Sequence, residues 1–357
     1  MFKFGEISDK CVKCGKCIQV CTIHHINSDE TTSPRGFLDL MGAYERGELK
    51  LDKSAKNIFE SCFLCTNCVE VCPNSLRVDT AIENVRRDIA EKFGIAWYKK
   101  AFFWLLRHRA VMDFCARLGY VFQSCAFKIR EGAMSPRFSL PMVKKERLLP
   151  TASKKSFLNS HAEFIDNGGD KTIGVFIGCM GNYAYTGIGE ALVKIARELG
   201  LNLNLMKKQA CCGAPAYFTG DFATVEVLAK RNIEYFEKML GELDAIIVPE
   251  ATCSAMIKID YEHFFHDDEQ WRERAKAVSK KIFLATEYFE KFTNLAEILA
   301  KKGKNLASVT YHDPCHARKM QGVFKEPRKL LAQNYEMIEM EDPNECCGFG
   351  GVTMQSE

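Results

Sequence analysis

Two cysteine runs, Cys11-Val-Lys-Cys14-Gly-Lys-Cys17-Ile-Gln-Val-Cys21 and Cys62-Phe-Leu-Cys65-Thr-Asn-Cys68-Val-Glu-Val-Cys72-Pro73, determine how this chain can fold. Both have the spacing Cys-x2-Cys-x2-Cys-x3-Cys, in which three thiolates on one tight loop hold three irons of a [4Fe-4S] cube. A zinc site would need only paired Cys-x2-Cys knuckles, and a disulfide framework would be typical of a secreted chain. Two full copies therefore predict two [4Fe-4S] clusters.

The fourth cysteine of each run is expected to bind the cluster of the other run, as in bacterial two-cluster ferredoxins. The predicted ligand sets are Cys11, Cys14, Cys17 and Cys72 for cluster 1, and Cys62, Cys65, Cys68 and Cys21 for cluster 2. Each predicted cube then has all its thiolates. The neighbouring His24 and His25 are therefore interpreted as surface or helix-capping residues rather than ligands.

Length and composition fit a multidomain protein of a reducing compartment. The chain has 357 residues, 17 of them cysteines, and a net charge of only +3, which gives no indication of a nucleic-acid partner. No secretion-signal pattern and no apolar run of about 18–20 residues is found. The expected location is the cytoplasm, with peripheral contact to the inner face of the cytoplasmic membrane as one option.

Between the cysteine runs and the rest of the chain, the pattern predicts helices and then a linker. Helices are expected over residues 37–49 and throughout 76–130, and a Pro-containing linker over 134–155. The aromatic and basic stretch 97–109 has two interpretations, a membrane-surface helix or a helix packed between domains or against a partner subunit. Cys115 and Cys125 are expected to be buried as small apolar residues.

The C-terminal body alternates strands and helices, which predicts a parallel sheet covered by helices. Expected strands are 172–177, 201–206 and 245–248, then 307–311 and 335–339; expected helices are 187–199 and 222–240. The interval from Cys179 to Cys211 is 32 residues, and from Cys315 to Cys346 it is 31. The body is therefore interpreted as two copies of one unit.

Each cysteine of the body follows a predicted strand. The carboxyl ends of parallel strands form a ligand-binding edge close to helix N-termini, which favours anionic groups such as thiolates and iron-sulfur cores. Adjacent cysteines suit an unusual cluster better than a simple cube. The first copy predicts a cluster site, and a candidate redox site, at Cys179, Cys211, Cys212 and Cys253.

Several motifs give the body a family resemblance. They are Gly178-Cys179-Met180, Cys211-Cys212-Gly213 and Cys253-Ser-Ala-Met256, then His312-Asp313-Pro314-Cys315-His316 and Glu345-Cys346-Cys347-Gly348-Phe349-Gly350-Gly351. With the cysteine runs and Ser33-Pro34-Arg35-Gly36, the chain resembles fused ferredoxin and CCG-domain proteins. These include heterodisulfide reductase subunits, the iron-sulfur subunits of glycolate oxidase and of anaerobic glycerol-3-phosphate dehydrogenase, and lactate-utilisation iron-sulfur proteins.

The expected fold is α+β and multidomain, with a helical two-cluster ferredoxin domain before a pseudo-duplicated α/β CCG domain with parallel sheets. The expected boundaries are 1–95 for the ferredoxin-like domain, 96–155 for a helical segment and linker, 156–300 for the first CCG repeat and 301–357 for the second.

Two departures from the family pattern affect the predicted sites. Met256 stands where the fullest form has a second Cys, so the first site offers four thiolates. The second repeat stops nine residues after Gly348 and is expected to be incomplete, with thiolates from Cys315, Cys346 and Cys347. His316 or His312 could supply a fourth ligand there; the alternative is that both histidines only make hydrogen bonds at a strand end.

The resemblance implies an iron-sulfur electron-transfer subunit of a flavin-linked dehydrogenase. The substrate would be a 2-hydroxy acid, such as glycolate or lactate, or glycerol 3-phosphate, with electrons passing to quinone or a membrane electron-transfer subunit. No Gly-x-Gly-x-x-Gly follows a predicted strand, so the flavin is expected on a separate FAD-containing dehydrogenase subunit. The alternatives are a heterodisulfide-reductase-type thiol/disulfide oxidoreductase with a non-cubane cluster at the first CCG site, and a redox-sensing or structural module. Whether the chain itself carries a catalytic site stays open.

Overall fold

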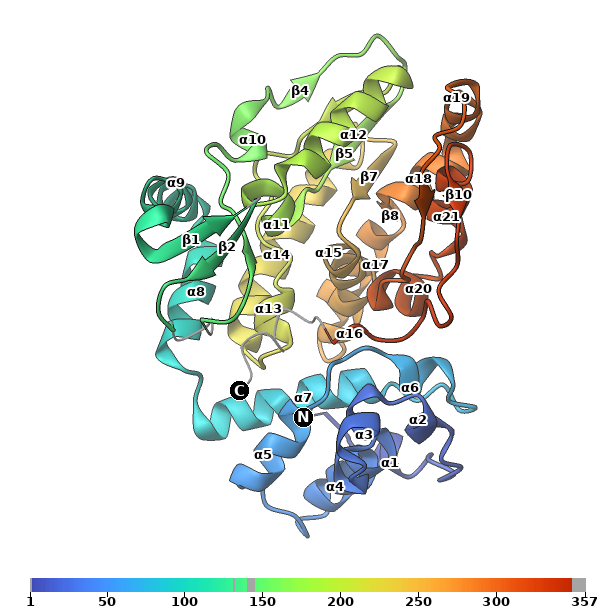
Figure 1. Ribbon diagram of the computed structural model, residues 1–357. Coiled ribbons are helices and arrows are strands. Elements are labelled where there is room, and N and C mark those ends of the chain that lie inside the picture. Colours follow the sequence, from blue (N-terminus) through green and yellow to red (C-terminus); the bar gives the residue numbers. More distant parts are fainter. Residues whose placement is uncertain (1, 131, 140–144, 349–357) are drawn as a thin grey trace.

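The computed structural model, which describes residues 2–130, 132–139 and 145–348, shows a helical N-terminal unit below a larger α/β body (Figure 1). The N-terminal unit contains α1 (Gly5–Ser8), α2 (Lys16–Gln19), α3 (Thr22–Asn27), η1 (Glu30–Thr32), α4 (Pro34–Glu45), α5 (Lys53–Glu60), α6 (Asn67–Glu70) and α7 (Val78–Phe93). The Ser33 side chain accepts a hydrogen bond from the Gly36 N–H at the start of α4, and Pro34 occupies its first turn. The helix expected over 37–49 therefore begins at Pro34.

The segment after α7 forms two helices and a small antiparallel sheet. These elements are α8 (Trp97–Arg107), α9 (Arg109–Ala126), β1 (Phe127–Arg130), β2 (Ala133–Pro136) and β3 (Leu149–Pro150). The prediction that the helix continues to residue 130 is wrong over 127–130. There, β1 pairs with β2 across a tight hairpin in which Gly132 has a φ of 80°. The segment expected to be a linker contains β2 and β3.

The expected burial of Cys115 and Cys125 is also wrong. Both thiols are exposed, because α9 runs along the surface and buries none of its residues. Neither sequence position nor residue type could show this, since burial depends on which elements pack over the helix.

A five-stranded sheet with strand order β4-β6-β5-β7-β8 is the centre of the body. The strands are β4 (Phe164–Ile165), β5 (Thr172–Val175), β6 (Asn202–Asn204), β7 (Ala245–Val248) and β8 (Ile282–Leu284). β4 is antiparallel to β6, and the other neighbours are parallel. The three strands expected here and their parallel arrangement are confirmed. β4 and β8 were not predicted; they are the two edge strands of the sheet, and their pairing depends on the neighbouring strand.

Helices connect or flank the strands of this sheet (Figure 1). They are α10 (Phe157–Ser160), α11 (Gly178–Tyr183), α12 (Thr186–Glu198), α13 (Ala214–Tyr217), α14 (Phe222–Met239), α15 (Ala251–Ala255), the π-helical turn η2 (Met256–Asp260), α16 (Tyr261–Phe264), α17 (Glu269–Ser279) and α18 (Ala285–Phe292). The two helices expected over 187–199 and 222–240 are confirmed as α12 and α14.

The second repeat has its own two-stranded parallel sheet. Its elements are α19 (Leu295–Lys301), β9 (Ser308–Val309), α20 (Cys315–Gln321), α21 (Lys325–Leu331) and β10 (Glu336–Met337). Both expected strands are present in shortened form. In the described ranges, every helix is too short or too polar to cross a membrane.

One buried side chain, Arg86 of α7, ties the N-terminal unit to the body. Its guanidinium donates hydrogen bonds to the carbonyl oxygens of Phe59, Glu60 and Cys62 in the N-terminal unit, and of Phe218 in the body, at 2.7–3.3 Å. The two backbones approach closely here, because a Cβ on Gly220 would lie 2.3 Å from the Arg86 carbonyl oxygen. A continuous hydrophobic core crosses the boundary around this contact.

We expect Arg86→Met to destabilise the protein by about 3–5 kcal/mol, because it leaves several buried carbonyl groups without a donor. The melting temperature of the cluster-loaded chain, followed by circular dichroism, should fall by roughly 6–15 °C. Arg46→Met is the matched control, since Arg46 forms an exposed pair with Glu48 worth less than about 1 kcal/mol. Equal melting temperatures for the two variants would contradict this role for Arg86.

Candidate iron-sulfur sites

Five cysteines from both cysteine runs line one cavity of the N-terminal unit. They are Cys11, Cys14, Cys17, Cys68 and Cys72, and the cavity is also lined by Leu38, Leu76, Val78, Lys13 and Arg35. Burial is the main cause that raises the pKa of Cys17 to about 11. The cavity thus contains all four thiols of the predicted ligand set of cluster 1, together with Cys68; ligation itself stays a prediction.

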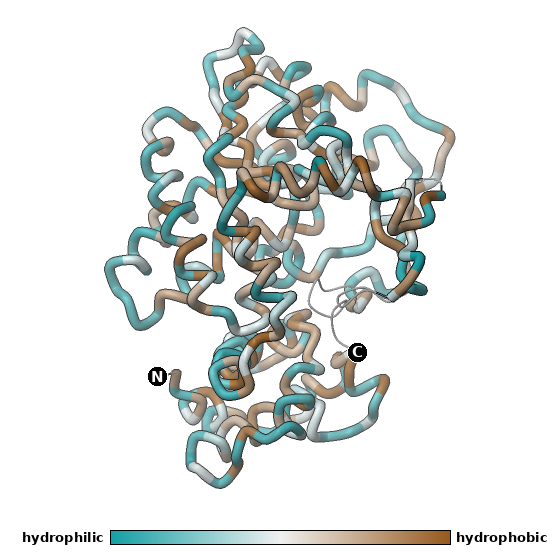
Figure 2. The backbone as a smooth tube through the Cα atoms, turned by 90° about the vertical axis from the view of Figure 1, so that its left-hand side faces the viewer, coloured by the Kyte–Doolittle hydropathy of each residue, from teal (hydrophilic) through white to brown (hydrophobic). Residues whose placement is uncertain are grey.

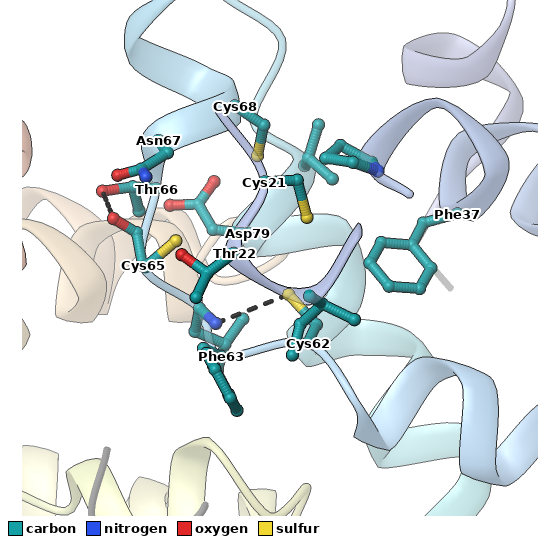
Figure 3. A pocket seen from close by; sticks show the side chains of 14 residues that line it. Cys21, Thr22, Phe37, Cys62, Phe63, Cys65, Thr66, Asn67, Cys68 and Asp79 are labelled. Carbon is teal, nitrogen blue, oxygen red and sulfur yellow. Dashed lines mark hydrogen bonds between the residues drawn. The ribbon is translucent and has the colours of Figure 1, made fainter. Parts of the chain in front are cut away.

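A second cavity is lined by four cysteines, of which Cys68 also lines the first cavity, and their sulfur atoms face a common space (Figure 3). They are Cys21, Cys62, Cys65 and Cys68. The crossing of Cys21 and Cys72 into each other's cavity matches the predicted cross-ligation. Burial raises the pKa of Cys62 to about 11 and that of Cys68 well above its usual range. These thiols would need iron to become thiolates at neutral pH.

The two cysteine loops have the same backbone shape. In the first loop Lys13 and Gly15 have φ values of 53° and 78°, and in the second the equivalent Leu64 and Thr66 have 54° and 60°. Left-handed conformations at Lys13, Leu64 and Thr66 are strained for residues with a side chain. Both loops turn through left-handed conformations at the same two positions, of which only Gly15 is free of strain, and they place three thiols around each cavity.

The first CCG site lies at the carboxyl edge of the main sheet. Cys179 belongs to α11 after β5, Cys211 and Cys212 follow β6, and Cys253 belongs to α15 after β7. The thiols form a continuous chain: Cys179 and Cys211 are hydrogen-bonded, Cys211 contacts Cys212, and the Cys212 and Cys253 sulfurs are 3.4 Å apart. The four predicted residues are therefore brought together.

Three residues that sequence reasoning missed support this site. Glu250 accepts hydrogen bonds from the Cys253 thiol at 3.3 Å and from the Gly181 N–H at 2.6 Å. Burial raises the pKa of the Glu250 carboxyl. Asn232 and Tyr261 donate to the carbonyl oxygens of Cys211 and Cys212, at 3.0 and 2.9 Å. The position of Glu250, two residues after strand β7, was the only sequence signal for any of the three.

Met256 occupies the position of the second Cys of the family pattern and is fully buried in the hydrophobic core. A fifth thiolate is therefore replaced there by an apolar side chain. The four thiols named above remain the cysteines that the structure brings together at this site.

The second-repeat cysteines lie against the N-terminal unit. Cys346 is hydrogen-bonded to both Cys315 and Cys65, and these bonds lower its pKa to about 2. The thiol of Cys65 belongs to the second cavity, so the body and the N-terminal unit meet through sulfur atoms. Cys347 is exposed. Residues 349–351 of the family motif lie outside the described residues.

Polar contacts hold the second repeat on α6. The Lys319 ammonium group is hydrogen-bonded to the Asn67 side chain and lies 3.6 Å from the Cys315 sulfur. Asn344 donates to the Glu70 carboxylate at 2.9 Å. These contacts fix Cys315 and Cys346 beside the second cavity.

The histidines considered as ligands make hydrogen bonds elsewhere. His312 bonds the Glu345 carbonyl oxygen at 2.8 Å, and His316 bonds the Thr252 hydroxyl at 2.9 Å while its ring stacks on Phe218. Burial lowers the pKa of His316 to about 4. His25 bonds the Gln19 carbonyl oxygen at 2.8 Å on the surface. These contacts favour structural roles for the three.

A buried acidic cluster lies between the second cavity and the first CCG site. Glu83 of α7 and Asp260 of η2 are 4% and 2% exposed. Burial is the first cause that raises both pKa values, that of Asp260 to about 8. Asp79 adds to the shift of both groups, and Asp260 adds to that of Glu83. Tyr217 is hydrogen-bonded to Glu83, and Arg77 forms an ion pair with Asp79 at 2.8 Å. With a pKa of about 8, Asp260 is largely protonated at neutral pH, and the environment of Glu83 also favours its neutral form.

A helical unit with two cysteine-lined cavities, docked on a sheet edge that carries further thiols, defines an iron-sulfur protein of the two-cluster class. The residues fit this cofactor, because each cavity is lined by at least four thiols, the number that a [4Fe-4S] cluster needs. A family model described as a 4Fe-4S dicluster domain matches residues 7–76, and the Cysteine-rich domain (CCG) model matches residues 173–258 and 309–357. The dicluster match implies two [4Fe-4S] clusters.

Three relatives cover much of the chain. The probable glycolate oxidase iron-sulfur subunit of Bacillus subtilis is 29% identical over 98% of this chain and 80% of that protein. Lactate utilization protein A of Exiguobacterium sp. is 33% identical over 50% of this chain and 72% of that protein. A subunit of the fumarate reductase (CoM/CoB) of Methanothermobacter marburgensis is 29% identical over 96% of this chain, which spans 58% of that protein. The chain belongs to the family that joins a 4Fe-4S dicluster domain to the CCG domain.

We expect Gly178→Ala to disrupt the first CCG site, since its Cβ would lie 1.8 Å from the Glu250 carboxylate and 3.1 Å from the Cys253 sulfur, at a φ of 70°. Iron assigned to this site should fall by at least about half, while the roughly eight irons of the two cubes remain. Anaerobic iron and sulfide analysis with EPR measures both. Gly187→Ala is the control, because a Cβ there meets nothing within 4 Å. Equal iron contents in the two variants would contradict the expectation.

The acidic cluster should make stability depend on pH. Asp260 binds a proton in the folded state up to a pKa of about 8, but in the unfolded state only up to about 3.9. The folded state therefore binds more protons between these values, so the free energy of unfolding falls as pH rises through this window and levels off above pH 8.

We expect Asp260→Asn to reduce the stability loss between pH 6 and pH 8.5 by about 1–2 kcal/mol, because the amide has no proton to lose. Melting temperatures at both pH values measure the effect. Glu242→Gln, at an exposed carboxylate, should behave as the unmodified chain. If the melting temperature changed equally between the two pH values in the unmodified chain, Asp260→Asn and Glu242→Gln, Asp260 would not be protonated in the folded state.

Proposed function

We propose that this chain is the iron-sulfur electron-transfer subunit of a flavin-linked dehydrogenase complex. The substrate would be a 2-hydroxy acid, such as glycolate or lactate, or glycerol 3-phosphate. The observation that carries the proposal is the hydrogen bond between Cys346 of the second repeat and Cys65 of the second cavity. Thiols of the body and of the N-terminal unit touch across the domain boundary, which is the arrangement an electron conduit needs.

We propose that the cysteines of the predicted ligand sets bind the iron-sulfur clusters. Cys11, Cys14, Cys17 and Cys72 would hold one [4Fe-4S] cluster, and Cys62, Cys65, Cys68 and Cys21 the other. A further cluster, non-cubane in type, is proposed at Cys179, Cys211, Cys212 and Cys253. Bound clusters would supply one-electron redox chemistry. The chain's own residues fix the thiols and surround them with buried apolar groups.

Partners are needed on both sides of this subunit. The sequence offers no flavin or nicotinamide fingerprint, so we propose that an FAD-containing dehydrogenase subunit oxidises the substrate. We propose quinone or a membrane electron-transfer subunit as the acceptor. The names of the relatives from B. subtilis and Exiguobacterium, which refer to glycolate oxidase and lactate utilization, support this assignment.

A second candidate function is direct disulfide reduction at the first CCG site. The observation that favours it is the carboxyl of Glu250, hydrogen-bonded to the Cys253 sulfur at 3.3 Å. Its raised pKa makes it a proton carrier beside a chain of thiols. Reduction of a disulfide to two thiols requires two electrons and two protons. The proposed clusters of the N-terminal unit would supply the electrons one at a time, Glu250 one proton and solvent the other.

We expect the chain, isolated anaerobically with its native partners, to be reduced by one of the proposed substrates, whereas the chain alone is not, because it lacks a flavin. EPR of the reduced clusters measures this. Cys65→Ser should lower the reduced signal by at least about half, since it removes one of four cluster ligands. Cys115→Ser is the matched control, because Cys115 is exposed and outside all four sites.

The opposite result would favour disulfide reduction. Two results together would show that the conduit proposal is wrong. None of the proposed substrates reduces the complex, and a disulfide, such as the heterodisulfide of coenzymes M and B, oxidises the dithionite-reduced chain. In that case Glu250→Gln should lower the rate of this oxidation. Equal signals from Cys65→Ser and Cys115→Ser would contradict the role of Cys65.

A further inference from the structure

Helix α9 presents one apolar face to solvent. Val111, Phe114, Leu118, Val121 and Phe122 have exposed fractions of 37–62%. With about 100° of rotation per residue, these five positions fall within roughly 100° of the helix circumference. The exposed apolar side chains are therefore gathered on one stripe rather than scattered.

The other side of α9 is fixed to the body. Arg109 donates to the Gln209 carbonyl oxygen at 3.3 Å, and the Tyr183 hydroxyl donates to the Asp113 carboxylate at 2.6 Å. These contacts hold the apolar stripe outward. The neighbouring α8 and β1 add exposed Trp97, Trp104 and Ile129. Figure 2 looks onto the side of the molecule where α8, α9 and β1 lie.

Positive charge is concentrated in this same segment. Residues 96–150 contain eleven Lys and Arg but only three Asp and Glu, a net charge of +8, whereas the whole chain has +3 and the remainder therefore has −5. No carboxylate among the described residues forms a salt bridge with Lys100, Arg117, Lys128 or Arg130. These cations, which have no salt-bridge partner in the described part of the chain, lie on α9 itself and on the neighbouring α8 and β1.

We propose that α9, with the exposed tryptophans of α8 and strand β1, docks the protein on an anionic phospholipid bilayer. An amphipathic helix with aromatic residues on one face and Lys or Arg beside them lies in the membrane interface, and acidic headgroups attract its cations. Since the described helices cannot span a membrane, the contact is peripheral. The negative remainder of the chain turns away from an anionic surface, which orients the docked molecule.

The unpaired cations favour a bilayer over a protein partner or a second copy. The buried centres of protein interfaces are depleted in Lys and other charged groups, whereas α9 and the elements packed on it carry several cations that no described carboxylate pairs with. The inference does not depend on the proposed electron route, because it concerns a surface formed by other residues than the cysteine sites.

The test is flotation of the intact, cluster-loaded chain with vesicles of phosphatidylcholine and phosphatidylglycerol at 7:3, and with pure phosphatidylcholine. We expect at least about tenfold tighter binding to the anionic vesicles, and weaker binding when NaCl rises from about 0.1 to 0.5 M, because salt screens the headgroup charge.

Two triple variants separate the apolar and charged contributions. The apolar variant is Phe114→Ser/Leu118→Ser/Phe122→Ser, and the charge variant is Arg117→Gln/Lys128→Gln/Arg130→Gln. The first should weaken binding to anionic vesicles by at least about tenfold, and the second should remove the preference for them. The matched controls change residues exposed elsewhere: Val227→Ser/Leu306→Ser/Ile338→Ser and Lys280→Gln/Lys301→Gln/Lys304→Gln. Unchanged iron content and circular dichroism show that each variant folds.

Three results would overturn the proposal. The first is that the unmodified chain does not float with vesicles. The second is that the α9 variants and their controls have equal effects on vesicle binding. The third is that the chain does not bind vesicles but forms a protein complex or dimer, which the apolar variant dissociates. The last would assign the stripe to a protein interface. Vesicle binding is measured separately from cluster content and substrate-dependent EPR. A failure of the membrane proposal can therefore be distinguished from a failure of the proposed function.

Discussion

The buried guanidinium of Arg86 is the interaction on which the arrangement of the sites depends. A buried charge is tolerated only when its donors are satisfied, and Arg86 meets this condition by bonding carbonyl groups from both the N-terminal unit and the body. One of them belongs to Cys62, the first residue of the second cysteine run. The side chain that joins the domains therefore also positions a cluster loop, and this docking allows Cys346 to reach Cys65.

Negative charge is the second constraint on the structure. Thiolates and iron-sulfur cores are anionic, and a low-dielectric interior makes repulsion between buried charges expensive. The charge of the acidic groups near the sites is reduced in two ways, by protonation and by ion pairing. Glu83, Asp260 and Glu250 have raised pKa values because of burial, whereas Asp79 is paired with Arg77. Protonation and pairing thus limit the charge that accumulates between the second cavity and the first CCG site.

Local spacing in the sequence was enough to predict the two cysteine runs as cluster loops, the strands that precede the cysteines of the body, and the parallel sheet. The hairpin of β1 and β2, the short strands β4 and β8 and the exposure of Cys115 and Cys125 were not predictable in this way. β4 and β8 are the edge strands of the main sheet, and their pairing depends on the neighbouring strand. The burial of a side chain is set by what packs over its segment.

The contacts between distant segments became known from the three-dimensional arrangement alone. Cys346 meets Cys65, Arg86 bonds Phe218, and Glu83 and Asp260 share one buried site. Arg86 and Phe218 are 132 positions apart, and the other pairs are also far apart in the chain. No local propensity encodes such pairs, because they form only when two separately specified units bury a common surface and must satisfy every polar group within it.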